Sequence, residues 1–156
     1  MTLFQFVEVL HVIGATVLLG TGVGIAFFML MAHRSGDARF IANTARVVVV
    51  ADLVFTATAV VAQPITGAWL ALQSGTPIWR GWVGLSLVLY VLTGALWLPV
   101  VWMQMQMRDL AAGAASAGVP LPPVYHRLWR LWFACGVPAF AAVIGIVFLM
   151  VVKPNV

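Results

Sequence analysis

Hydrophobic residues fill four long segments of the chain, and these segments contain no charged side chain. No Asp, Glu, Lys or Arg occurs in residues 9–33, 53–79, 81–107 and 131–152, which are runs of 25, 27, 27 and 22 residues. A helix crosses the hydrocarbon core of a bilayer with about 20 apolar residues, so each run is long enough to span a membrane. The pattern predicts a single membrane domain, residues 1–156, with four spans at about residues 3–31, 42–72, 78–107 and 124–152.

Composition points to the same class of protein. Hydrophobic residues make up 63% of the 156 residues and charged residues 8%, whereas soluble domains carry about 25% charged residues. The mean hydropathy is +1.08. We therefore expect an all-α, four-helix transmembrane bundle. A soluble enzyme and a nucleic-acid-binding protein are excluded, and so is a disulfide scaffold, because Cys135 is the only cysteine.

The basic residues predict how the bundle is oriented. Two of the eight, Arg80 and Lys153, lie on the side of the termini, and six lie in or beside the first and third connections: Arg34, Arg39, Arg46, Arg108, Arg127 and Arg130. Cytoplasmic loops are enriched in Lys and Arg, so we expect an N-out, C-out protein with the first and third connections in the cytoplasm. The N-terminal segment lacks a basic region, and the first apolar segment is therefore interpreted as a retained span and not as a signal peptide.

Short segments of turn-forming residues separate the spans. Residues 35–37 (Ser-Gly-Asp) are a start signal for the second helix, residues 73–77 (QSGTP) form a turn cluster, and residues 109–123 form an Ala- and Gly-rich linker that ends in PLPP. Gly20 and Gly24 form a GxxxG motif in the first span. This motif predicts a close helix contact within the bundle.

Three ionisable side chains, Glu8, His11 and Asp52, lie at membrane depth, where such groups are costly and mark functional sites. Glu8 and His11 are three residues apart and share a helix face. His11 lies about 12 Å below the outer surface, at the depth of Gln63 and Tyr90. Two interpretations stay open. His11 is either part of a hydrogen-bonded core with Glu8, Gln63 or Tyr90, or it is an axial ligand of haem in a cofactor pocket.

Polar side chains recur along one face of two further spans. In the second span they are Asp52, Thr56 and Gln63, and in the third they are Ser86, Tyr90, Thr93 and Trp97. Asp52 and Gln63 differ by only about 20° around a helix axis, so we expect these faces to line a bundle interior that is polar in its outer half. Asp52 itself lies about 15 Å into its span, close to the bilayer midplane.

A second candidate metal site lies at the cytoplasmic ends of the spans. His33 is about 33 Å from His11 along the first helix, so one porphyrin cannot use both. His33 and His126 lie at one level and are either a bis-histidine site or ordinary solvated histidines beside arginine. Methionines gather at the same end, where they are interpreted as Cu(I) ligands or as flexible packing residues; they are Met29, Met31, Met103, Met105 and Met107.

Several runs resemble a family of bacterial integral membrane proteins over almost the whole chain. They are LHVIGA at 10–15, FFM at 27–29, AHRSGD at 32–37, QPITG at 63–67, LPVVW at 98–102, MRDL at 107–110, LPPVYH at 121–126 and LMVVKP at 149–154. In these runs the chain is similar to the domain of unknown function 2269 family. The resemblance implies a four-helix inner-membrane protein and carries no established activity.

A more distant similarity concerns the first span. The pair Leu10-His11 early in the span, with His33 just past its end, resembles the HemJ-type protoporphyrinogen oxidases. Those are small four-helix membrane proteins that carry haem b on a span-one histidine, and the similarity implies that His11 binds the haem iron. HemJ-type proteins also have a functional lysine in a later span, and residues 81–107 contain none. The resemblance thus extends to haem binding and not to the lysine of the oxidases.

Together these observations predict a small b-type haem-binding protein that serves electron transfer or porphyrin and haem handling. His11 would bind the iron, with Glu8, Gln63 and Tyr90 around it. Its partners would be the lipid bilayer and either a membrane redox protein or a second copy of the chain, and any enzymatic activity would be that of an oxidoreductase. The first alternative is a non-enzymatic structural or accessory subunit, followed by protoporphyrinogen oxidation and then copper handling.

Overall fold

The first helix shows how local sequence sets the ends of a long span. In the computed structural model, which describes residues 1–155, α1 runs from Leu3 to Ser35. The Thr2 hydroxyl accepts a hydrogen bond from the backbone N–H of Gln5, and the Gln5 side chain accepts one from the Thr2 N–H. This capping box satisfies the free donors at the helix start. Gly36 ends the helix in a left-handed conformation with a φ of 68°, which glycine adopts without strain.

The second crossing is one continuous helical rod with a π-helical turn at its centre. It consists of α2 (Ala38–Ala51), η1 (Asp52–Thr56) and α3 (Ala57–Gln73). The Asp37 carboxylate accepts hydrogen bonds from the N–H groups of Arg39 and Phe40, which confirms the helix start predicted at residues 35–37. A π turn is rare in proteins and is frequently found at functional sites. Here it begins at the aspartate that the sequence placed near the membrane midplane.

The third and fourth helices extend further than the predicted linker allows. α4 (Gly81–Ala117) continues through most of the segment predicted as a linker, and α5 (Pro123–Val152) begins at the last residue of that segment. The prediction of a linker over residues 109–123 is therefore wrong for residues 109–117. Alanine has the highest helix propensity of all residues, and Ala111 and Ala114 are buried. Propensity and packing together keep this segment helical.

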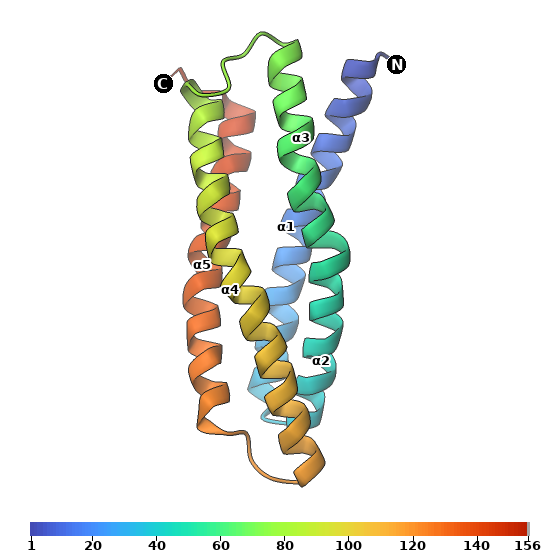
Figure 1. Cartoon of the computed structure of the whole chain (residues 1–156), viewed down its shortest axis with the longest axis vertical. Coiled ribbons are helices and arrows are strands. Elements are labelled where there is room, and N and C mark those ends of the chain that lie inside the picture. Colours follow the sequence, from blue (N-terminus) through green and yellow to red (C-terminus); the bar gives the residue numbers. More distant parts are fainter. Residues whose placement is uncertain (156) are drawn as a thin grey trace.

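The helices lie side by side along one axis, and both ends of the chain lie at the same end of the bundle (Figure 1). We call this the termini end, and we call the opposite end, which holds the connections at residues 36–37 and 118–122, the loop end. α4 packs along α5 and against α2, whereas α1 packs on α3 and α2. Four crossings return the chain to its starting side, and which side faces the cytoplasm stays a prediction.

The hydrophobic core occupies the loop-end half of the bundle, where α1, α2, α4 and α5 meet. Its buried residues form one cluster: Ile25, Met29, Ala32, Ile41, Ala42, Ala45, Val48, Val100, Met103, Met107, Ala111, Tyr125, Leu128 and Trp132. Small alanines alternate with large side chains in this cluster, which lets the helices approach closely. Ile25 on α1 and Val100 on α4 are the members of this cluster that lie nearest the termini end on their helices. The two halves of the bundle are therefore packed differently.

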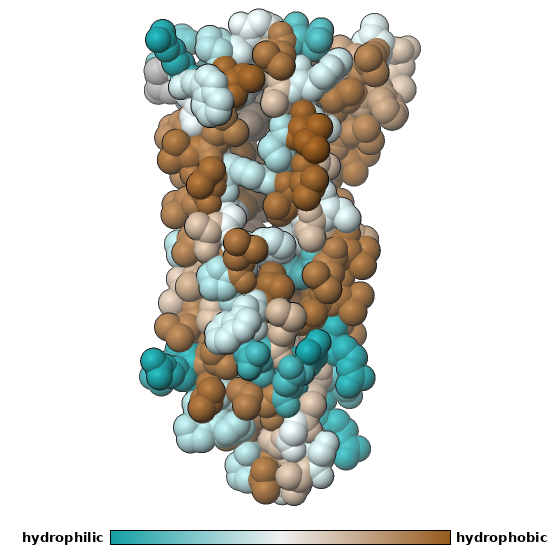
Figure 2. Space-filling view, in the orientation of Figure 1, coloured by the Kyte–Doolittle hydropathy of each residue, from teal (hydrophilic) through white to brown (hydrophobic). Residues whose placement is uncertain are grey.

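The outer surface is that of a membrane protein. Four helices are long and apolar enough to cross a bilayer: Leu3–Ser35, Ala38–Gln73, Gly81–Ala117 and Pro123–Val152. On the face in Figure 2, hydrophobic side chains cover most of the upper and middle parts of the bundle, and hydrophilic ones gather at the termini end and in a band across the loop-end third. Soluble monomers do not expose apolar surface on this scale, so lipid covers it.

The GxxxG motif of α1 does not make the helix contact predicted from the sequence. A β-carbon added at Gly20 would have no neighbour within 4 Å, and one at Gly24 would meet only a phenylalanine of the same helix. The prediction of a contact within the bundle is therefore wrong. The reason is the rotation of α1, which turns its Ile25, Met29 and Ala32 side chains into the core and leaves Gly20 outside.

Candidate functional site

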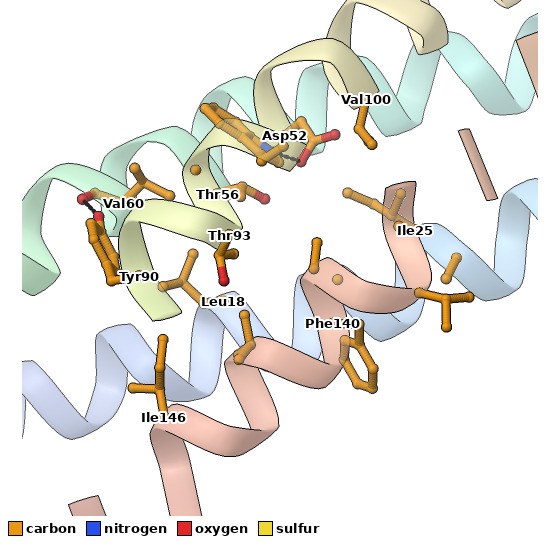
Figure 3. Close-up of a pocket in the computed structure, with 18 of the residues that line it drawn as sticks. Leu18, Ile25, Asp52, Thr56, Val60, Tyr90, Thr93, Val100, Phe140 and Ile146 are labelled. Atoms are coloured by element: carbon orange, nitrogen blue, oxygen red, sulfur yellow. Dashed lines mark hydrogen bonds between the residues drawn. The ribbon is translucent and has the colours of Figure 1, made fainter. Parts of the chain in front are cut away.

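A cavity of about 390 Å³ lies inside the bundle, between the core at the loop end and the termini end. All four crossings contribute to its walls. Part of the hollow is visible between the two columns of side chains in the upper half of Figure 2. Figure 3 shows apolar side chains such as Leu18, Phe140 and Ile146 on one side of the space and the hydroxyl groups of Thr56 and Thr93 on the other. The volume lies within the range of pockets that hold small organic ligands, about 300–1,000 Å³.

The end of the cavity nearest the loop end is polar. Asp52 on η1, Gln104 on α4 and Trp132 on α5 are, for each of these crossings, the lining residue closest to the loop end. Thr56 follows one turn after Asp52 and is also buried. We call these four residues the polar floor of the cavity. The other lining residues are mostly apolar, and the further polar ones are Gln63, Tyr90 and Thr93.

The side chains of the polar floor lie close together but are poorly paired, with Asp52 beside Thr56 and Gln104. Within residues 1–155, no hydrogen bond of good geometry is made by Asp52 Oδ2, Thr56 Oγ1, Gln104 Nε2, Gln104 Oε1 or Trp132 Nε1, and all five atoms are buried. Gln104 is 0% exposed, so its amide is covered by neighbouring side chains and is reached by neither lipid nor water. Leaving a buried polar group unpaired costs about 1–3 kcal/mol. Such a cluster is a departure from normal packing that requires an explanation.

Two residues of the polar floor, Asp52 and Thr56, belong to the π turn. Asp52 and Thr56 are the first and last residues of η1, and both are buried while the residues between them are exposed. Trp97 on α4 donates a long hydrogen bond of 3.4 Å from its indole N–H to Asp52 Oδ1. This bond joins the polar faces predicted for the second and third spans. It occupies one carboxyl oxygen of Asp52, and the other oxygen is buried without a hydrogen bond at the cavity wall.

His11 lies near the termini end in the contact between α1 and α3, where it is half-buried. Its Nδ1 is 2.8 Å from the Thr66 hydroxyl oxygen. The Thr66 hydroxyl also lies 2.8 Å from the Ala62 oxygen, so it can donate its proton to the helix backbone and accept a hydrogen bond from the Nδ1–H tautomer of His11. A neutral imidazole that is protonated on Nδ1 carries its free lone pair on Nε2.

Two glycines make room for His11 and its neighbour Gln63. A β-carbon at Gly67 would lie 3.1 Å from His11 Cε1, so the imidazole packs directly on the α3 backbone. A β-carbon at Gly14 would overlap the amide nitrogen of Gln63, which donates a 2.8 Å hydrogen bond to the backbone carbonyl of His11. Gln63 also lines the cavity. The His11 position therefore adjoins the termini end of the cavity, although the imidazole is not one of its lining side chains.

The hydrogen-bond partner of Tyr90 is a backbone carbonyl of α3 that Pro64 leaves free. Pro64 lacks an N–H group, so the carbonyl of Val60, four residues earlier on α3, receives no helical hydrogen bond from it. The Tyr90 hydroxyl donates a hydrogen bond to this Val60 oxygen (Figure 3). The tyrosine is thus bonded to the α3 backbone and not to the imidazole of His11.

Of the three residues predicted to surround His11, Gln63 alone bonds to it, and Tyr90 and Glu8 do not. Gln63 reaches the backbone of His11 and Tyr90 reaches α3, whereas Glu8 is exposed on the outside of α1. The residue that contacts the His11 ring nitrogen is Thr66, which the sequence analysis did not single out. Its signal was available, because Thr66 follows Gln63 by three residues and so lies on the same helix face.

The loop-end histidines form an aromatic cluster. The His33 ring stacks on Trp129 with 4.0 Å between ring centroids, and the His126 ring lies edge-on to it at 6.0 Å. His33 Nδ1 is 3.3 Å from the Tyr125 hydroxyl. Within residues 1–155, no group of three or more His, Cys, Asp or Glu residues lies close enough to hold a metal ion.

The methionines at the same end take different positions. Met29, Met103 and Met107 are buried in the hydrophobic core, while Met31 is exposed. Thioether side chains fill irregular spaces in cores, and that role accounts for the three buried ones.

Two residues of the polar floor were missed from the sequence. Gln104 lies seven residues after Trp97, two helical turns further along the polar face predicted for the third span. Extending that face would have found it. Tryptophan is common at membrane interfaces, whereas Trp132 is buried in the bundle with its indole nitrogen unpaired.

These features define the chain as a four-span integral membrane protein with a cavity between its helices. Residues 5–154 match the model of a family described as predicted integral membrane protein (DUF2269). The match covers nearly the whole chain, and the protein belongs to this family. No curated protein and no solved structure shows significant similarity to it.

Proposed function

We propose that the protein is a small haem-binding membrane protein, with haem b held by His11 and a role in electron transfer or in porphyrin and haem handling. The observation that carries the proposal is the hydrogen bond between His11 Nδ1 and Thr66. Iron is bound by an unprotonated imidazole nitrogen, and ligating histidines almost always donate their other N–H to a neighbouring oxygen. His11 meets this requirement inside the apolar part of α1.

The residues around His11 fit one axial ligand. Thr66 orients the ring, Gly67 lets it pack on α3, and Gln63 holds the α1 backbone at His11. His33 and His126 lie at the loop end, so the haem would be five-coordinate or carry a weaker sixth ligand. A bound haem would supply one-electron exchange at its iron. The first-span histidine that resembles that of the HemJ-type proteins is the sequence basis of the same proposal.

The test is the visible spectrum of the purified protein after expression with haem supplied. We expect a Soret band in the wild-type protein and its loss in His11→Ala, with the helix content unchanged by circular dichroism. Thr66→Val removes the acceptor of the Nδ1–H bond and should weaken haem affinity about 10–100-fold. His33→Ala and His126→Ala are the matched controls and should keep the band.

Two outcomes would contradict the proposal. A protein that stays colourless with haem supplied would favour the structural or accessory subunit, especially if it co-purifies with another membrane protein. Loss of the band in the His33 or His126 variants, with retention in His11→Ala, would move the haem to the loop end.

A further inference from the structure

We propose that the cavity is a binding site for a lipid-soluble quinone or quinol, held by its head group on the polar floor. The site uses Asp52, Thr56, Gln104 and Trp132. None of these residues belongs to the His11 site, so this proposal is independent of haem binding.

The unpaired atoms describe the head group that would satisfy them. Trp132 Nε1 can only donate a hydrogen bond, the Gln104 amide donates and accepts, and the Thr56 hydroxyl does both. Five unpaired atoms from three helices meet at the floor. A head group with several oxygen atoms satisfies more of them than a single hydroxyl can. Quinone carbonyls accept hydrogen bonds, and quinol hydroxyls also donate them.

The charge of the site excludes anionic head groups. The residues that line the cavity include one carboxyl group, that of Asp52, and no Lys, Arg or His. A phosphate or carboxylate head would be buried beside Asp52 without a counter-charge, which is strongly unfavourable in a low-dielectric interior. A quinone or quinol head carries no charge and avoids this cost.

The shape of the cavity supplies the place for an apolar body. Above the floor the walls consist mainly of aliphatic and aromatic side chains of α1, α4 and α5, such as Leu18, Phe140 and Ile146 (Figure 3). Trp97 and Trp132 place two indole rings beside the floor, where they can pack on a flat ring. A quinone ring with the first part of an isoprenoid tail has this combination of a polar flat head and an apolar body.

The experiment measures binding of three probes that share a decyl tail: a decyl-benzoquinone, decyl alcohol and decanoate. Saturable quenching of tryptophan fluorescence reports the quinone, because Trp97 and Trp132 line the cavity. The other two are tested as competitors of the quinone in the same detergent. We expect the quinone to bind most tightly, the alcohol more weakly and decanoate not at all.

Paired variants separate the floor from the rest of α4. Gln104→Leu removes the buried amide, whereas Gln106→Leu changes an exposed amide two residues further along the same helix. Gln104→Leu should weaken quinone binding about tenfold, the loss expected for one to two hydrogen bonds, and Gln106→Leu should not change it. The melting temperature of ligand-free Gln104→Leu should equal or exceed that of the wild type, because an unpaired buried amide is gone. Trp132→Phe keeps a ring and removes one donor, and it should weaken binding several-fold.

The proposal is overturned if decyl alcohol or decanoate competes as well as the quinone binds, since the floor would then not select a quinone head. It is also overturned if Gln104→Leu and Trp132→Phe bind the quinone like the wild type. A ligand-free Gln104→Leu protein that melts lower than the wild type also overturns the proposal, because the amide would then stabilise the bundle without any ligand. Repeating the titration on His11→Ala distinguishes this site from the haem site, because quinone binding should be unchanged there.

Discussion

Gly14 and Gly20 provide the sharpest test of how α1 and α3 fit together. Both glycines lie in α1, and an alanine at either should stabilise the helix by about 0.5–1 kcal/mol through its higher propensity. At Gly20 the added methyl group enters open space, so that gain should be realised in full. At Gly14 the methyl group overlaps the amide nitrogen of Gln63 and displaces it from the His11 carbonyl.

The expected difference follows from that one hydrogen bond. Losing it and leaving a buried amide unpaired costs about 1–3 kcal/mol, which outweighs the propensity gain. Gly14→Ala should therefore be less stable than Gly20→Ala by about 2 kcal/mol, which corresponds to about 4–8 °C in melting temperature for a chain of this size. Cys135, the only cysteine, is half-buried against the core, so its reaction with a thiol-reactive dye during heating reports unfolding.

A third variant checks the cause of the effect. With Gln63→Ala in place there is no amide to displace, and adding Gly14→Ala should no longer lower the melting temperature. If Gly14→Ala melts at or above Gly20→Ala in the wild-type background, the packing of Gln63 on α1 described above is wrong.

Three further expectations concern other parts of the bundle. Asp52→Asn should fold and melt close to the wild type because the amide oxygen still accepts the indole N–H, whereas Asp52→Leu should lose about 1–3 kcal/mol; equal loss for both, measured by thermal unfolding, would contradict this account. Tyr90→Phe should cost about 0.5–1.5 kcal/mol in the wild type, and less in a Pro64→Ala background, where a new helical N–H competes for the Val60 oxygen; a double-mutant cycle that gives no coupling would refute it. A reporter that is active only in the cytoplasm should be inactive when fused after Val156, and activity there would reverse the predicted N-out, C-out topology.

Sequence periodicity predicted which polar side chains face the interior of the bundle but not which groups they contact there. Helical spacing correctly placed Asp52, Thr56 and Gln63 in the interior, and they line one cavity. The same spacing did not reveal which group each of them meets, because a partner on another helix depends on the rotation and depth of that helix. The imidazole of His11 was expected to meet Glu8, Gln63 or Tyr90, and it meets Thr66.

Backbone irregularities were the second source of difference. The π turn at Asp52–Thr56 cannot be predicted from hydropathy, since it changes the hydrogen-bond pattern and not the composition. Pro64 was visible in the sequence, but its effect, a free Val60 carbonyl that accepts the Tyr90 hydroxyl, required the position of α4.

The number of membrane crossings, the place of each crossing along the chain and the shared side of the two termini all follow from the hydropathy pattern. Each helix satisfies its own backbone hydrogen bonds and inserts according to its own apolar length, so these properties are local to each segment. Three features became visible only when the helices were seen packed together. The core fills the loop-end half, Gln104 and Trp132 line the same space as Asp52, and a cavity remains above them. Those features arise because side chains far apart in the sequence compete for the same volume, and the outcome depends on the shapes of all four helices at once.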